Sequence, residues 1–498
     1  MSDHGLDPRA PVLVGVGSCH DDVEAVELMV RASLAAGTDA TPALLSQVER
    51  ISVTHGTWSY ADPARIIADR IGAPDATTVL VDVGIPQQTV IDETLASLLA
   101  GEVEVALVVG GEAKARDARL RAQSTQADAA GIASVFRGES GGAETDQGDV
   151  SPDVHQHPVG DLVDPAELDA GLWAPVDQYA LIENALAAAE GVDPQQLCRD
   201  LGALYGRFNE VARTNPEAAF PAPMSADDIA TFSPRNRPLA FPYAKWHVTQ
   251  WTVDQGAALL LCTVGAAERA GVPRDRWVFP VVGLGSSHMV PLTQRGDLHR
   301  WPAMAVLGEA AEQRLGHPLS DCDLVELYSC FPVAVRVQQR ELGLPLAGTP
   351  TVTGGMAFAG GPFNSFVFQA LVTVVRRLRE VGGRALVTSV SGLLTKPGLG
   401  VWSTSSDGQP PLIADLADDV RASTPVVPVV RDAVGTGTVA SWTVTHEGQE
   451  PTALVVIVDL DDGGRAIARS DDRKRIDRAL QRGACGDPVS VDRGRIVD

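Results

Sequence analysis

The sequence predicts an α/β protein made of two similar halves, each built on a mostly parallel sheet. In the first part of the chain and again in the later part, short β-branched runs alternate with helical stretches, as in βαβ units. In addition, Ala100–Gly111 and Val381–Gly392 share one pattern, in which a helix ends at glycine and an apolar strand leads to a second glycine. The shared pattern indicates a duplication, although helix–glycine–strand units are common in α/β proteins.

The elements of each half follow from runs of apolar residues and from the glycines that bound them. In the first half we expect strands at Pro11–Cys19, Arg50–Thr54, Thr77–Gly84 and Val103–Val109, and helices at Asp22–Ala36, Pro63–Gly72 and Ile85–Ala100. In the second half we expect strands at Trp277–Gly285, Asp323–Tyr328 and Arg384–Val390, and helices at Pro302–Leu315, Pro332–Gly343 and Ser365–Val381.

Two regions depart from this alternation. Between the halves, the polar segment Asp146–Gly160 predicts a loop, and helices are expected at Gln178–Glu190 and Pro194–Ala212. Near the end, Gly437–His446 and Pro451–Leu460 alternate apolar and polar residues around a turn, which predicts an antiparallel hairpin. The sequence thus divides into a first half (1–115), an inserted helical lid (116–240), a second half (241–415) and a β-rich C-terminal domain (416–498).

Composition excludes several classes of function. The 498 residues carry 64 acidic and 40 basic side chains, a net charge of −24, which argues against a broad nucleic-acid or anionic-membrane surface. The sequence contains neither a secretory signal pattern nor an apolar run of about 18 residues, so we expect a cytoplasmic protein with no membrane-spanning helix. Its six scattered cysteines include no C-x-x-C pair, and we expect no disulfide framework and no metal site.

Five segments, in order along the chain, resemble the thiolase superfamily. They are Gly84–Ala113, Val253–Leu261, Val325–Phe331, Gly354–Phe366 and Val387–Ser403. The resemblance covers about residues 10–410, and the appended tail makes the chain most similar to the actinobacterial thiolase-like proteins of type 1. It implies the thiolase fold, a layered αβαβα core with a small OB-like domain at the end. It also implies an acetyl-CoA acetyltransferase-like ancestry in lipid metabolism and an acyl-CoA thioester as ligand, with no other cofactor.

The family's chemistry needs a nucleophilic cysteine, a catalytic histidine, a second cysteine and an asparagine that helps to hold an oxyanion water. By resemblance, these positions are occupied here by Gly84, Gly361 and Val390, and by the segment that begins at Tyr328. All four groups are therefore replaced, while the glycines of the scaffold are kept. A covalent acyl-cysteine mechanism is not expected.

The segment Tyr328-Ser329-Cys330 offers the first candidates to replace the missing catalytic groups. Cys330 is either a relocated nucleophile before a helix N-terminus or a small buried side chain at a tight turn. Tyr328 either supplies a hydroxyl as acid or oxyanion donor or fills volume, and the same alternatives hold for Ser329. All three are candidate catalytic residues.

Four residues elsewhere complete the candidate site. His247 is a candidate general base, although its tryptophan neighbours favour a packed histidine. Candidate substrate-binding residues are His288, Asn364 and Lys396. Asn364 either points into the pocket or caps the helix that begins at Ser365, and Lys396 lies in a loop after the last core strand, where it meets a substrate group or solvent.

These residues support two functions of different kinds. In the first, the protein binds an acyl-CoA and acts on a carbon–carbon bond without a cysteine nucleophile, for example in retro-aldol cleavage with Tyr328 or His247 as base. In the second, it is a non-catalytic acyl-CoA-binding or scaffolding protein. The resemblance implies a homodimer through the core sheet, which the added domain could alter, and the C-terminal domain is a candidate surface for a partner protein.

Overall fold

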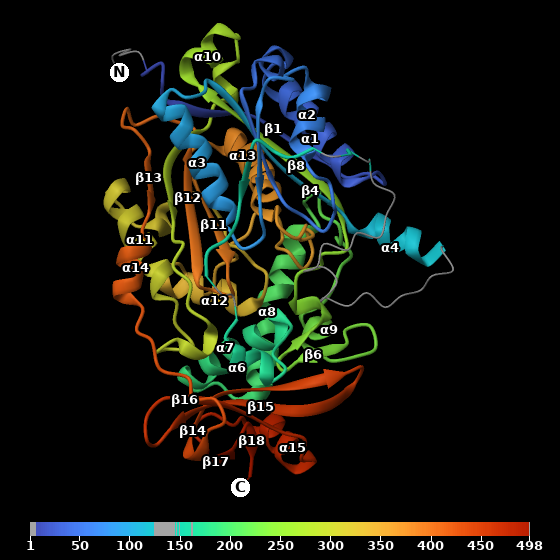
Figure 1. Ribbon diagram of the computed structural model, residues 1–498, viewed down its shortest axis with the longest axis vertical. Coiled ribbons are helices and arrows are strands. Elements are labelled where there is room, and N and C mark those ends of the chain that lie inside the picture. The colour runs from blue at the N-terminus through green and yellow to red at the C-terminus, as the bar shows by residue number, and fades with distance from the viewer. Residues whose placement is uncertain (1–5, 124–144, 146, 149, 161–162, 498) are drawn as a thin grey trace.

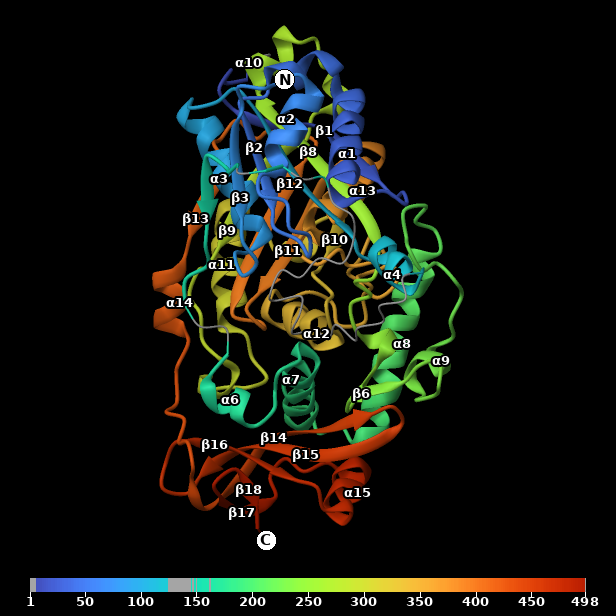
Figure 2. The same cartoon turned by 45° about the vertical axis from the view of Figure 1, so that its right-hand side comes forward.

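The computed structural model describes residues 6–123, 145, 147–148, 150–160 and 163–497. Helices and two mixed sheets alternate in five layers, and a small β-barrel lies at the end of the molecule far from the N-terminus (Figure 1). Two helices of the insert, Pro165–Asp169 and Pro175–Ala189, lie between the sheets and the barrel (Figure 2). The expected layered αβαβα core with an appended β-rich domain is therefore confirmed.

The first sheet has the strand order β1-β8-β4-β2-β3-β5. Its strands are β1 (Pro11–Cys19), β2 (Arg50–Thr54), β3 (Thr77–Val81), β4 (Val105–Ala113), β5 (Val154–Gln156) and β8 (Asp254–Thr263). β8 runs antiparallel to β1 and β4, whereas β2 is parallel to β3 and β4. Although β8 lies in the range expected for the second half, the chain returns to the first sheet after the insert to form it.

The second sheet repeats this arrangement. Its order is β10-β11-β12-β9-β13, and its strands are β9 (Phe279–Gly285), β10 (Leu324–Glu326), β11 (Arg384–Ser391), β12 (Lys396–Ser403) and β13 (Leu412–Asp415). The run β10-β11-β12-β9 has the same order and the same parallel and antiparallel pairings as β2-β4-β8-β1. The two halves are therefore similar, as the glycine-bounded helix–strand pattern predicts.

Lys396 lies in a strand and not in a loop. The segment Lys396–Ser403 forms β12, which pairs with β11 on one side and β9 on the other. Its Pro397, Gly398 and Gly400 disfavour a strand when they are judged locally. The structure explains Gly398, because a Cβ there would lie 2.5 Å from the Cβ of Gln88 on the helix that packs against this strand.

Two helices form the layer between the sheets, α3 (Gln87–Ala100) and α13 (Phe366–Val381). Each ends at a glycine with positive φ, Gly101 at 72° and Gly382 at 75°, as the glycine-bounded pattern requires. α1 (Ala25–Ala40) and α2 (Pro63–Ile71) cover the outer face of the first sheet, and α11 (Pro302–Leu315) that of the second. α10 (Val264–Arg269) follows β8, and α12 (Pro332–Glu341) packs on α11 and on the insert.

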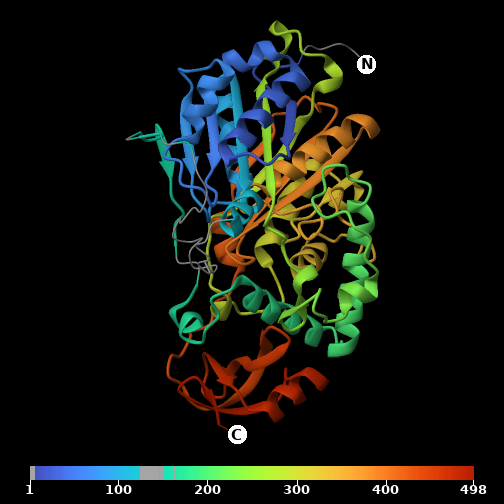
Figure 3. The same cartoon turned by 90° about the vertical axis from the view of Figure 1, so that its right-hand side faces the viewer.

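The insert is helical where the structure describes it. It contains the end of α4 (Lys114–Gln123), then α6 (Pro165–Asp169), α7 (Pro175–Ala189), α8 (Pro194–Ala212), α9 (Ala226–Ala230) and the short strand β6 (Pro238–Ala240), which pairs with β7 (Tyr243–Ala244). Residues 124–144 of the expected insert lie outside the described residues. Figure 3 shows α8 extending along one side of the molecule from the core to the barrel.

The C-terminal domain is a closed five-stranded barrel that follows α14 (Ala417–Ser423). Its strands are β14 (Val434–Glu447), β15 (Glu450–Leu460), β16 (Arg465–Ser470), β17 (Pro488–Asp492) and β18 (Arg495–Ile496). They are ordered β14-β15-β16-β18-β17, and β17 pairs with β14 to close the barrel. α15 (Arg473–Arg482) joins the third strand to the fourth, so the topology is OB-like and the predicted hairpin is confirmed.

No helix among the residues described here is both long and apolar enough to cross a membrane.

Candidate functional site

The candidate centre lies where the two halves meet at the ends of their strands. Gly84 follows β3 in the first half, and Ser391 and Lys396 flank the turn between β11 and β12 in the second. The Lys396 amine donates a hydrogen bond to the Gly84 carbonyl, and the Ser391 hydroxyl donates to the same oxygen at 3.1 Å. Residues that are about 300 positions apart in the sequence therefore meet where the thiolase resemblance places the nucleophile.

Lys396 is the most unusual group at this centre. The residue is only 5% exposed, and no acidic side chain in the described part of the chain forms an ion pair with it. Burial lowers the pKa of its ammonium group. A buried lysine with a lowered pKa holds more of its amine in the neutral form, which is the form that accepts a proton or attacks a carbonyl.

The backbone before Lys396 is strained. Leu393 and Leu394 both have left-handed φ values, 58° and 61°, a region that side chains with a Cβ rarely occupy. The Thr395 hydroxyl donates to the Gly392 carbonyl at 2.8 Å and so closes the turn. The turn between β11 and β12 thus holds Lys396 at a defined place beside Gly84.

Gly84 itself does not accommodate the family's cysteine. Its φ is 104°, which favours glycine, and a Cβ on it would lie 3.1 Å from the Cβ of Pro158 and 4.0 Å from the Lys396 amine. Pro158 belongs to the segment that follows β5. The insert therefore covers the position from which a cysteine would act.

Gly361 likewise leaves no room for a catalytic histidine. A Cβ there would lie 2.2 Å from Cγ2 of Thr249 and 3.1 Å from Cε of Met356. The Gly361 amide donates to the carbonyl of Gln250 at 3.0 Å, which brings the two segments together. Val390, in the position of the second cysteine, is a buried residue of β11 paired with Pro397.

Tyr328, Ser329 and Cys330 lie together in the buried segment between β10 and α12. Burial raises the pKa of the Cys330 thiol to about 12 and that of the Tyr328 hydroxyl well above its ordinary value, so both are protonated near pH 7. The Ser329 hydroxyl accepts a hydrogen bond from the Met356 amide at 3.0 Å. These contacts are those of packed side chains, and a catalytic role for the three residues stays a prediction.

The other predicted site residues do not gather around Gly84. His247 is fully buried between Tyr205 and Tyr243, and burial lowers the pKa of its imidazole to about 3. His288 lines a different, small cavity, and burial lowers its pKa as well. Asn364 does not cap α13, because its amide donates to the His55 carbonyl at 3.1 Å.

A large groove lies beside the Gly361 segment. Its volume is about 890 Å³, and its lining combines three basic residues, Arg235, Arg237 and Lys245, with two tryptophans, Trp246 and Trp251. The Lys245 amine lies 4.7 Å from the ring centre of Trp246. Such a surface suits a phosphorylated ligand that carries a flat ring, through charge and stacking.

Part of the groove lining is hydrogen-bonded to the segments that carry Cys330 and Met356. Two of its lining residues, Thr249 and Gln250, donate their backbone amides to the carbonyls of Cys330 and Met356, both at 3.1 Å. The overall charge of residues 151–240 does not reveal this groove, because the range contains only five arginines. Two of them, Arg235 and Arg237, cluster near Lys245, which lies just beyond the range. The alternation of basic and aromatic residues over Arg235–Trp251 was the signal available in the sequence.

One further group of residues could hold a metal ion. Asp82, His155 and His157 place ligand atoms within 4.8 Å of one another at the edge of the first sheet. Both histidines fall in the polar segment Asp146–Gly160, for which the sequence predicts a loop. Their His-x-His spacing was the available signal, since imidazole nitrogens are common zinc ligands.

Comparisons with known proteins place this fold. No family model matches the sequence, and no curated protein matches it. Among solved structures, a monomeric SCP2-thiolase-like protein of type 1 from Mycobacterium smegmatis is 26% identical with a TM-score of 0.81, and the alignment covers 99% of this chain and 100% of that one.

Two other solved structures share the fold over a smaller part of this chain. The Ltp2–ChsH2(DUF35) aldolase is 17% identical with a TM-score of 0.56, covering 81% of this chain and 100% of that one. The dimeric peroxisomal thiolase of Saccharomyces cerevisiae is 13% identical with a TM-score of 0.55, covering 80% and 99%. With its duplicated halves, its added barrel and its full-length match to the mycobacterial protein, the chain has the thiolase fold and is similar over its whole length to an SCP2-thiolase-like protein of type 1.

Proposed function

We propose that the protein binds an acyl-CoA thioester with its nucleotide in the groove lined by Arg235, Arg237, Lys245, Trp246 and Trp251. The three cations match the phosphates of coenzyme A, and the indole rings match its adenine. Thr249 and Gln250, which line the groove, are hydrogen-bonded to Cys330 and Met356, and the proposal is that the acyl chain enters the core from this side.

At the centre, the proposed chemistry is the making or breaking of a carbon–carbon bond with Lys396 as the base. The observation that carries this proposal is the buried Lys396 amine at the Gly84 carbonyl, where a thiolase has its nucleophile. Tyr328 and His247, the bases expected from sequence, are less suited. The pKa of Tyr328 is raised well above the neutral range, and that of His247 is lowered far below it.

A retro-aldol cleavage of a β-hydroxyacyl-CoA illustrates the step. The neutral Lys396 amine takes the β-hydroxyl proton, and the oxygen electrons form a carbonyl at the β-carbon as the bond between the α- and β-carbons breaks. The electrons of that bond pass to the thioester oxygen as an enolate, which takes a proton back at the α-carbon from the lysine ammonium. The products are an aldehyde or ketone and a shortened acyl-CoA. No covalent acyl-enzyme is needed.

A second function is supported by the cover over Gly84. Pro158 packs against this position, and the lysine amine is engaged with a backbone carbonyl. A non-catalytic acyl-CoA-binding protein needs no more than the groove. The two functions differ in whether Lys396 is required for turnover.

Calorimetry with coenzyme A and acetyl-CoA tests the groove. We expect Lys245→Ala to weaken binding about tenfold, because it removes one charge-assisted contact worth about 1.4 kcal/mol. Arg274→Ala is the matched control, since Arg274 lies 3.8 Å above the ring of Trp277, outside the groove lining. Absence of binding at millimolar ligand would contradict both functions.

The chemical step is tested by following β-hydroxyacyl-CoA cleavage with Lys396→Met, a substitution of similar length without the amine. Loss of cleavage with unchanged coenzyme A affinity supports the lysine as base. Cleavage that survives the substitution rejects that role, and a wild-type protein that binds without cleaving supports the non-catalytic function.

A further inference from the structure

A carboxylate and two imidazoles converge at the edge of the first sheet. Nε2 of His155 lies 2.9 Å from Oδ1 of Asp82, and Nδ1 of His157 lies 2.6 Å from Oδ2 of the same residue. The two rings are 4.2 Å apart between centres. Both histidines therefore direct a nitrogen at one carboxylate.

The backbone holds this arrangement in place. His155 belongs to β5, which pairs in parallel with β3, and Leu80 is its partner in the register. The Asp82 amide donates to the Gln156 carbonyl at 3.0 Å, so the segments that bear the three side chains are joined between the two histidines. His157 follows β5 directly, and the contacts of both imidazoles with Asp82 show that the two rings face this carboxylate.

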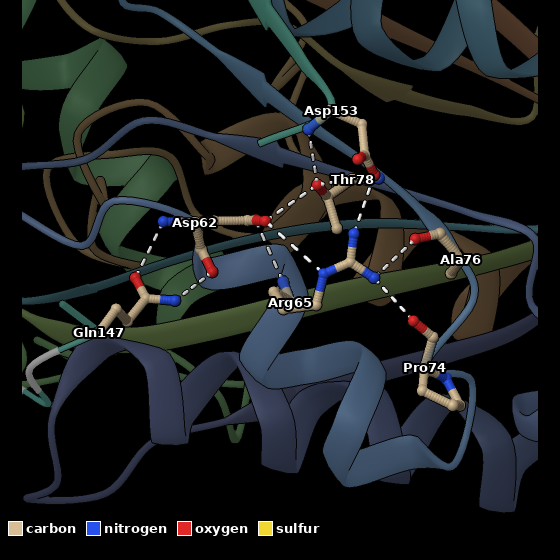
Figure 4. Close-up of polar contacts among 7 residues, drawn as sticks. All are labelled: Asp62, Arg65, Pro74, Ala76, Thr78, Gln147 and Asp153. Carbon is tan, nitrogen blue, oxygen red and sulfur yellow. Dashed lines mark hydrogen bonds and ion pairs between the residues drawn. The ribbon is translucent and has the colours of Figure 1, made fainter. Parts of the chain in front are cut away.

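A second network anchors the beginning of β5, as Figure 4 shows. The Asp153 amide donates to the Thr78 hydroxyl at 3.0 Å, and the Thr78 amide donates to Oδ2 of Asp153 at 2.8 Å. Arg65 pairs with the same carboxylate at 2.9 Å. Asp62 accepts from the Thr78 hydroxyl at 2.9 Å, and its own amide donates to Gln147 at 2.9 Å. These bonds position β5 without help from the Asp82 cluster.

We propose that Asp82, His155 and His157 form a binding site for one divalent transition-metal ion, with Zn²⁺ as the ion whose ligand preference the set matches. Zinc binds imidazole nitrogen and carboxylate oxygen, and sites with three protein ligands leave a fourth position open. A tetrahedral ion about 2.1 Å from each ligand needs ligand atoms about 3.4 Å apart. The two N–O distances, 2.9 and 2.6 Å, reach this value by movements of less than 1 Å.

Exposure keeps the site open to an ion from solvent. The side chains of His155 and His157 are 39% and 65% exposed, and that of Asp82 is 29% exposed.

The proposed metal site lies close in sequence to Gly84 and to the residue that covers it. Asp82 is two residues before Gly84, and His157 directly precedes Pro158, which covers Gly84. An ion that joins Asp82 to His157 would fix this cover over the candidate centre. Metal binding does not depend on the proposed acyl-CoA chemistry and is measured separately from it.

The test uses the full chain without an affinity tag, first stripped of metal by a chelator. We expect calorimetry to show one Zn²⁺ bound per chain, with affinity at least tenfold weaker in His155→Ala and in His157→Ala. His317→Ala, at a partly exposed histidine of the second half, is the matched control and is expected to bind as the wild type does.

Cobalt gives an independent reading. Co²⁺ bound at this site should give visible bands without thiolate charge transfer, which separates the site from the six cysteines. Circular dichroism checks that each variant is folded, and Asp82→Asn keeps the size of the side chain while removing its charge. No Zn²⁺ binding at millimolar metal, or equal binding in folded His155→Ala and His157→Ala, would overturn the proposal.

Discussion

At the residue scale, Gly84, Gly361 and Lys396 distinguish this chain from the thiolase pattern. Gly84 and Gly361 do more than lack the expected side chains, because a Cβ would be strained and crowded at Gly84 and would clash with Thr249 at Gly361. The sequence predicts the loss of these groups, since it can be seen at positions aligned by local motifs. It does not predict the contact between Lys396 and Gly84, because the two are 312 residues apart and no local pattern links them.

Restoring the cysteine should therefore not restore thiolase activity. Gly84→Cys places a Cβ at positive φ and 3.1 Å from Pro158, and we expect it to lower the free energy of unfolding by about 1–3 kcal/mol. Thiolysis of acetoacetyl-CoA should stay at background. Gly101→Cys, also at positive φ but with open space around its Cβ, separates backbone strain from crowding. Thiolysis by the Gly84→Cys protein at ordinary thiolase rates would refute this account.

Among the secondary-structure elements, strands with long apolar runs could be predicted from the sequence. Strands that form because neighbouring strands supply their hydrogen bonds could not. β1 has the expected bounds because nine residues carry a continuous apolar signal. β12 contains proline and two glycines, and becomes a strand because two neighbours supply hydrogen bonds. β5 has only three residues in a polar segment, and its pairing with β3 is what makes it a strand.

A buried carboxyl group on the central helix α3 is expected to make the free energy of unfolding depend on pH. Burial between the two sheets raises the pKa of Asp92 to about 8, although the Gln88 side chain donates a hydrogen bond to it at 2.7 Å. Below about pH 4, Asp92 is protonated in both the folded and the unfolded chain, and its contribution to stability is fully present. As the pH rises toward 8, the unfolded state loses its proton first, so stability falls by up to about 1.4 kcal/mol per pH unit.

Asp92→Asn should remove the contribution of Asp92 to the fall of the unfolding free energy with rising pH. Urea unfolding at about pH 5, 6 and 7 measures it, and the slope should become flatter than that of the wild type. A residual slope is expected, because burial also raises the pKa values of Glu112, Glu326 and Asp177 to about 7. An unchanged slope would show that Asp92 is ionised in the folded protein.

At the scale of the whole molecule, the sequence predicts the core halves and the barrel better than the contacts that join them. The duplicated core and the barrel follow from patterns within each segment. The attachment of the barrel depends on buried side chains from distant segments, such as Arg465 of β16. Its guanidinium pairs with Asp459 at 2.7 Å and donates to the carbonyls of Thr293, Arg295 and Gly296 in the second half.

Arg465 should therefore stabilise the junction. Arg465→Met leaves buried carbonyls without donors, and we expect the free energy of unfolding to fall by about 2–3 kcal/mol. Arg473→Met, on the exposed surface of α15, is the control and should change stability by no more than about 0.5 kcal/mol. Urea unfolding and limited proteolysis at the junction measure both. Equal stability of the two variants would mean that the contacts of Arg465 do not contribute to holding the barrel.

The barrel is joined to the rest of the protein by the chain itself, by the contacts of Arg465 and by the pairing of β14 with β6 of the insert. A separate subunit leaves its partner when the protein is dilute, whereas a tethered one stays at an effective concentration of about a millimolar. The barrel and the core consequently occur in a one-to-one ratio at every expression level, and their assembly needs no encounter between molecules. Whatever the barrel contributes to the core is present as soon as a single chain has folded.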